Sequence, residues 1–90
     1  MTRQEQFRRN HELFALFMQQ VLDNPSLTNK IPKGAQVIFL PESDRDLHEA
    51  NLKLGRALRK KGTKVAFIKI KLVRQVITVY KPEIEFTQAA

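Results

Sequence analysis

The feature that most constrains this 90-residue chain is a long run without turn-forming residues. Residues 64–80 contain no Gly, Pro, Asn, Asp or Ser, the residue types on which most tight turns depend. Fully extended, this run would span roughly 55 Å, whereas a globule of this length is only about 30 Å across. The run must therefore bend, form a bulge, or leave its own subunit, for instance as an arm that pairs with a neighbour's sheet.

Two strands are expected inside this run, at residues 65–72 (VAFIKIKL) and 76–80 (VITVY). Only Arg74 and Gln75 are placed to form a tight turn between them, and neither favours the positive φ that two-residue hairpins need. An earlier strand is expected at residues 36–40, because QVIFL is a short apolar run between turn residues.

A first helix is expected from Thr2 to Asp23, because Thr2 and Glu5 match a capping box. Apolar side chains at helical spacing predict its face towards the core: Phe7, His11, Phe14, Met18, Val21 and Leu22. Three more apolar residues widen the arc: Leu13, Leu16 and Phe17. A helix with so wide an apolar arc is buried on two sides. The second side faces either another subunit or, equally well, the rest of its own chain.

A second helix is expected from Ser43, which forms a capping box with Asp46, to about Lys61, with Gly62 just beyond its end. Its predicted buried stripe is Leu47, Ala50, Leu54, Ala57 and Leu58. A strand, this helix and a strand form a βαβ unit, whose two strands should be parallel.

The expected fold is a small single α/β domain over residues 1–90, with the order α-β-α-β-β. A short mixed sheet, made of one parallel βαβ unit and a C-terminal strand, is covered by two helices. Residues 83–90 are expected to be a loose tail.

The chain has few residues suited to catalysis. It has no Cys and two His, and neither a nucleophile elbow nor a phosphate-binding glycine motif is present. We therefore expect a protein that is not an enzyme and needs no cofactor. No apolar run approaches the roughly 20 residues of a membrane span, and residues 1–12 do not resemble a signal peptide. The expectation is a cytoplasmic protein with no membrane partner.

Three carboxylates follow the expected strand 36–40: Glu42, Asp44 and Asp46. Ligands bind at the carboxyl ends of parallel strands in open α/β sheets, and carboxylates suit a hard cation such as Mg²⁺. Acidic residues are also favoured in the first turn of a helix for electrostatic reasons alone. The three are weak candidates for a metal site, so a metal-dependent enzyme is the third functional hypothesis.

Charge is divided unevenly along the chain. Residues 1–49 carry 6 basic and 7 acidic side chains, whereas residues 50–90 carry 10 basic and 2 acidic ones. Such asymmetry indicates nucleic acid or an acidic protein as partner, unless the charge serves only solubility. The alternative function is thus a basic nucleic-acid-binding regulator, including one that is half of a two-protein module. Its expected phosphate contacts are Arg56, Arg59, Lys60, Lys64, Lys69, Lys71 and Arg74.

Three segments carry a family resemblance: N-P-x-L at residues 24–27, I-P-x-G-A at residues 31–35, and F-L-P-E at residues 39–42. On these segments the chain resembles a family of short uncharacterised prokaryotic proteins, classed as a domain of unknown function. The resemblance covers about residues 13–71. It implies a shared fold unit and brings no activity and no catalytic residues.

The hypothesis that the residues favour is a small non-catalytic binding or accessory protein that forms homo-oligomers. It depends on the wide apolar arc of the first helix and on the missing turn in residues 64–80. The expected interface consists of Leu13, Leu16, Phe17, Val76, Thr78 and Tyr80.

Overall fold

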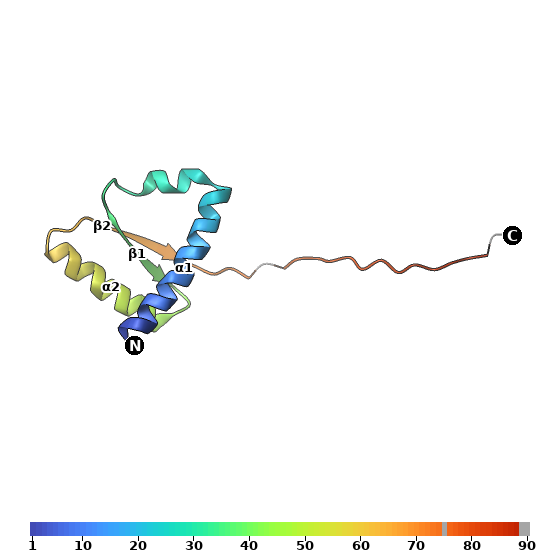
Figure 1. Ribbon diagram of the computed structural model, residues 1–90, viewed down its shortest axis with the longest axis horizontal. Helices are drawn as coiled ribbons and strands as arrows, with labels where there is room; N and C mark the ends of the chain where they lie inside the picture. The colour runs from blue at the N-terminus through green and yellow to red at the C-terminus, as the bar shows by residue number, and fades with distance from the viewer. Residues whose placement is uncertain (75, 89–90) are drawn as a thin grey trace.

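The computed structural model describes residues 1–74 and 76–88 (Figure 1). Two helices and a short 3-10 helix surround a small parallel sheet, and the chain then runs out as an extended tail. The elements are α1 (Arg3–Asp23), the 3-10 helix η1 (Pro25–Lys30), β1 (Gln36–Pro41), α2 (Arg45–Lys60) and β2 (Val65–Ile70). The protein is therefore a small mixed α/β domain, as the sequence predicts.

The helix ends are set by local polar contacts. The Thr2 hydroxyl accepts a hydrogen bond from the Glu5 backbone N–H at 3.1 Å, which confirms Thr2 as the cap of α1. At α2 the cap is Asp44, whose carboxylate accepts from the Leu47 N–H at 3.2 Å. The prediction of Ser43 was one residue too early. Gly62 follows α2 with a φ of 86°, a conformation that glycine adopts without strain.

The sheet has two strands, β1 and β2, which pair in parallel from Gln36 opposite Val65 to Pro41 opposite Ile70. This confirms the βαβ unit. The strand predicted at residues 76–80 does not form within the single chain, because these residues pair with no other strand in its described part. Gln75, at the expected turn, lies outside the described residues.

The core lies on both faces of this sheet. On one face, Phe39 of β1 packs with Leu13 of α1 and with Leu47 at the start of α2. Alternation along the strands places Val37, Ile68 and Ile70 on the same face as Phe39, and all three pack against this cluster. On the opposite face, Gly55 of α2 lies against Ile38 and Phe67.

Both helices are rotated relative to the prediction. Phe7 and Phe14 of α1 are 74% and 50% exposed, whereas Leu13 is buried. In α2, Leu54 is 44% exposed, and the buried positions are Leu47, Asn51 and Gly55. Apolar spacing predicted the wrong inner faces for two reasons. Asn51 and Gly55 occupy the inner face of α2, and two polar residues of α1, Gln6 and Asn10, turn inwards to bond Asn51.

The described residues between 71 and 88, 71–74 and 76–88, are called the tail below; they leave the folded body and extend away from it (Figure 1). The molecule consequently measures 83 Å along its longest axis and 31 and 18 Å along the others. Three outcomes were expected for residues 64–80: a bend, a bulge, or departure from the folded body. In the structure, the described residues beyond β2 depart from the folded body. The predicted loose end at 83–90 belongs to this longer tail as far as residue 88, and residues 89 and 90 lie outside the described residues.

Candidate functional site

The two outer edges of the sheet are determined by the direction of the ladder hydrogen bonds. The Gln36 N–H donates to the Lys64 carbonyl at 2.8 Å, and the Glu42 N–H donates to the Ile70 carbonyl at 2.9 Å. Because backbone groups alternate along a strand, even-numbered residues of both strands face each other. Odd-numbered residues therefore direct their N–H and C=O groups towards the outer edges.

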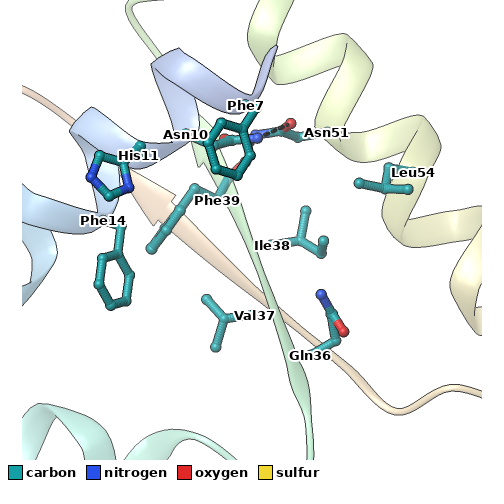
Figure 2. A pocket seen from close by; sticks show the side chains of 10 residues that line it. All are labelled: Phe7, Asn10, His11, Phe14, Gln36, Val37, Ile38, Phe39, Asn51 and Leu54. Carbon is teal, nitrogen blue, oxygen red and sulfur yellow. Dashed lines mark hydrogen bonds between the residues drawn. The ribbon is translucent and has the colours of Figure 1, made fainter. Parts of the chain in front are cut away.

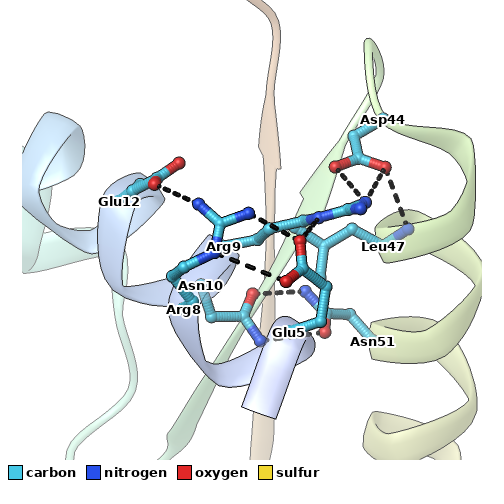
Figure 3. A network of polar contacts seen from close by, with 8 residues as sticks. All are labelled: Glu5, Arg8, Arg9, Asn10, Glu12, Asp44, Leu47 and Asn51. Carbon is cyan, nitrogen blue, oxygen red and sulfur yellow. Dashed lines mark hydrogen bonds and ion pairs between the residues drawn. The ribbon is translucent and has the colours of Figure 1, made fainter. Parts of the chain in front are cut away.

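The outer edge of β1 is blocked at two of its three outward positions. The Asn51 side-chain amide donates to the Phe39 carbonyl at 2.8 Å, and Pro41 has no N–H to offer. Asn51 is itself held by α1: it donates to Asn10 at 2.7 Å and accepts from Gln6 and Asn10 at 3.0 and 3.1 Å. This network is drawn in part in Figure 3. A further strand cannot add along the full length of this edge.

The outer edge of β2 is open. The outward backbone groups of Val65, Phe67 and Lys69 have no hydrogen-bond partner within residues 1–74 and 76–88. We call these groups the β2 edge. An open groove of about 520 Å³ runs beside it, between β2 and the C-terminal half of α1. Its apolar lining consists of Leu16, Phe17, Leu27, Ile68, Ile70, Leu72 and Val73.

The tail begins directly at the end of β2 and is rich in exposed apolar side chains. Those that lie beyond residue 75 are Val76, Ile77, Val79, Tyr80, Ile84 and Phe86, each at least 73% exposed. A protein seldom leaves so many large apolar side chains in water unless they meet a partner. The β2 edge, its groove and the tail together form the candidate site.

A cluster of charged residues fixes α1 onto the start of α2 (Figure 3). Arg9 contacts both Glu5, at 2.9 Å, and Asp44, at 3.1 Å. Hydrogen bonds from Arg8 and Arg9 lower the pKa of Glu5 to about 2. Each of the three carboxylates in this cluster, Glu5, Glu12 and Asp44, is paired with Arg8 or Arg9.

A second hollow, of about 250 Å³, lies between α1 and α2 beside β1 (Figure 2). Phe7, Phe14 and Leu54 contribute apolar side chains to it, and the ring of His11 stacks on Phe7 with centroids 6.2 Å apart. His11 is the one titratable side chain among the lining residues. A lone imidazole has no second group there with which to form a catalytic pair.

Residues 5–83 match the model of a protein family that is described as a family of unknown function (DUF5647). The chain belongs to this family. No curated protein and no solved structure matches it. The match to the family extends well beyond the predicted range of 13–71 and includes the tail as far as residue 83. Residues 71–83 of the tail therefore lie within the match to the family, whereas residues 84–88 lie beyond it.

The predicted metal ligands are not brought together. The described residues contain no group of three or more His, Asp or Glu side chains placed to hold a metal ion. Asp44 caps α2 and pairs with Arg9, while the nearest cation to Glu42 is Lys69, at 4.0 Å. Asp46 lies on the exposed side of the first turn of α2.

The seven predicted phosphate contacts are all exposed but lie in different places. Arg56 and Lys60 line one shallow hollow on α2, together with Lys53. Arg59 instead covers the Phe67 ring at 4.7 Å. The remaining four are near β2 and in the tail: Lys64, Lys69, Lys71 and Arg74.

The six predicted interface residues divide into three groups. Leu13 is buried in the core of its own chain, so its prediction as an interface residue is wrong. Phe17 is half-buried against the Phe39 ring, with centroids 5.6 Å apart, and Leu16 lines the groove. The other three, Val76, Thr78 and Tyr80, are exposed in the tail.

Sequence reasoning missed Asn51 and Gly55, which occupy the inner face of α2. Their signal is the spacing of Leu47, Asn51 and Gly55 at intervals of four, which places all three on one side of a helix. Hydrophobic periodicity cannot detect this face, because only one of its three residues is a large apolar one. Across the part of the chain that the structure describes, no helix is long and apolar enough to span a membrane.

Proposed function

We propose that this chain is a non-catalytic binding protein that forms homo-oligomers through the β2 edge and the tail. The observation that carries the proposal is the apolar tail, exposed directly beside a strand with unpaired backbone groups. An added strand satisfies those groups while its alternate side chains enter neighbouring pockets, which is the usual mode of β-augmentation.

Stability considerations support the same proposal. A sheet of only two strands is marginal by itself and needs further strands or helices. Each large apolar side chain that moves from water into an interface contributes about 1.5–3 kcal/mol. Burial of six such residues beyond position 75 would offset much of the cost of ordering and docking the tail.

The test is the mass of the full chain in solution, measured by light scattering at tens of micromolar. We expect a multiple of 10.5 kDa. The matched variant carries Ile84→Ser and Phe86→Ser, two exposed changes that leave the folded body intact, and it should associate more weakly. A full chain that stays at 10.5 kDa under these conditions contradicts the proposal.

A second candidate function, nucleic-acid binding, is supported by one observation. Lys53, Arg56 and Lys60 line the same hollow on α2 and present three cations on one helix face. Titration of labelled random DNA and RNA across a salt series tests it. Phosphate contact gives an affinity that falls linearly with salt in a log–log plot, and replacing all three by Gln should flatten the slope. No binding at low salt removes this candidate.

A further inference from the structure

We propose that the tails of two copies pair antiparallel, with Ile77 of one copy opposite Ile77 of the other, and that the end of each tail lies on the other copy's β2 edge. This inference rests on the proposed function and specifies its partner and its register. Such a contact is isologous, because a twofold axis at Ile77 relates the two halves, and it closes as a dimer.

The first argument is charge. Lys69 and Glu85 lie equally far from Ile77 on its two sides, and so do Lys71 and Glu83. In antiparallel pairing centred on Ile77, each lysine of one copy therefore lies directly opposite a glutamate of the other. These are the only two carboxylates in residues 50–90, where ten basic residues stand. Cross-strand pairs of opposite charge stabilise a particular register.

The second argument is the groove beside β2. In the same register Ile70 meets Ile84 of the other copy, and Ile68 meets Phe86 of the other copy. Ile68 and Ile70 are on the sheet face that carries the groove, next to Leu16, Phe17 and Leu27. Paired residues share one face of a sheet, so Ile84 and Phe86 would enter that groove. Phe86 is 95% exposed without such a partner.

The third argument is the direction of the backbone. The unpaired groups of the β2 edge belong to odd-numbered residues, and this register pairs odd positions with odd positions. Pro82 is then at an even position, where its missing N–H would point away from the β2 edge. A proline is tolerated in a strand on that condition. A slip by one residue would place Pro82 in the ladder and direct Glu83 and Glu85 away from the lysines.

The fourth argument excludes the same pairing within one chain. A hairpin in this register would need its turn at Val76, Ile77 and Thr78, three β-branched residues. Such residues are stiff and favour extended backbone, and the left-handed conformations that tight hairpins use disfavour them. A strand that cannot turn back on itself can satisfy the same pairing only with a second copy, which is the logic of a domain swap.

The test uses two charge-swapped full-length variants. The first carries K69E and K71E, and the second carries E83K and E85K. Each variant alone places like charges at both ends of the paired tails, whereas a one-to-one mixture restores opposite charges at both ends. We expect self-association of each variant to be at least about tenfold weaker than that of the natural chain. The mixture should recover a dimer of one copy of each.

The outcomes separate this inference from the proposed function. If each variant alone dimerises as tightly as the natural chain, the register is overturned while homo-oligomer formation stands. A natural chain that is itself monomeric overturns both. A mixture that forms long polymers overturns the antiparallel dimer in favour of parallel head-to-tail pairing, and a mixture that stays monomeric also overturns the register.

A second measurement does not depend on charge. The chain contains no Cys, so V76C with T78C introduces a pair that the register places opposite each other across the dimer, about 4.5 Å apart between Cα atoms. That separation suits a disulfide. Oxidation should therefore yield a covalent dimer. The matched control, V76C with Y80C, offers no directly opposed pair and should cross-link far more slowly. Equal cross-linking of both pairs overturns the register.

Discussion

The side chain of Asn51 in α2 donates a hydrogen bond to the backbone carbonyl of Phe39 in β1 at 2.8 Å. The same side chain bonds Gln6 and Asn10, so one buried amide joins α1, α2 and the sheet. Asn51 is 1% exposed, and none of its polar atoms is left without a partner. Together with the packing of Leu13 and Phe17 against Phe39, this amide holds α1 in place on the sheet.

Replacing Asn51 by Asp keeps its size but removes two donors and buries a charge. The carbonyl of Phe39 then loses its partner, so the free energy of unfolding should fall by about 1–3 kcal/mol or more. Urea denaturation at pH 7 measures the change. Asn29→Asp, at an exposed position, is the matched control and should stay within about 0.5 kcal/mol of the natural chain. Equal losses for both variants would contradict the role given to Asn51.

Gly55→Ala should destabilise the protein although alanine is the better helix former. A β-carbon at position 55 would overlap the Phe67 ring at atoms Cε1 and Cζ. That overlap should cost about 1–3 kcal/mol, more than the roughly 1 kcal/mol gained in helix propensity. In a Phe67→Leu background the ring is absent, and Gly55→Ala should become neutral or stabilising. A thermal denaturation cycle over the four variants tests this, and an unchanged penalty in that background would refute it.

Stability should decline in acid partly through Glu5. Hydrogen bonds from Arg8 and then Arg9 lower its pKa to about 2 in the folded state, below its ordinary value of 4.5. A depressed pKa means that the contribution is complete above pH 4.5 and is lost as the pH falls towards 2. Denaturation of the natural chain and of Glu5→Gln should therefore differ at pH 7 and converge towards pH 2. Asp23→Asn, which removes a carboxylate outside this cluster, is the matched control for the loss of one negative charge.

Association should protect the tail from trypsin. Arg74 is an exposed cleavage site in the single chain, and paired strands are poor protease substrates because cleavage needs an opened backbone. Cleavage after Arg74 should slow severalfold as the protein concentration rises, when followed by mass spectrometry. The K69E/K71E variant is the control, and its cleavage should depend little on concentration. Cleavage of the natural chain that is independent of concentration would count against tail pairing.

Much of the folded body follows from local sequence signals. The Thr2 cap, the glycine after α2 and the parallel βαβ unit are each encoded by a few neighbouring residues. The rotation of α1 about its own axis is not encoded by neighbouring residues, because two adjacent stripes of its surface are apolar and either one fits a core. The choice depends on Asn51, which is distant in sequence and polar.

The pairing of the tail could not be predicted from the sequence for a different reason. Residues 76–80 have the composition of a strand, yet a strand forms only where another strand pairs with it. Within one chain the β2 edge is the nearest partner, and residues 76–78 are too stiff to turn the chain back towards it. Sequence alone therefore predicts the extended conformation of these residues but not their pairing. For the candidate site, it identified Leu16 and the tail residues and missed the open edge of β2.

The blocked edge of β1 has a consequence for aggregation. Chains that add to each other edge by edge form fibrils when every added strand exposes a fresh edge. In the proposed dimer, each half of the sheet would run from β1 through β2 to the partner's tail, so β1 would be one of its two outer strands. This strand would present the amide of Asn51 and the ring of Pro41 where a newcomer needs free backbone. Addition of a further strand at β1 would be hindered there, so the same residues that position α1 would also protect this edge from aggregation.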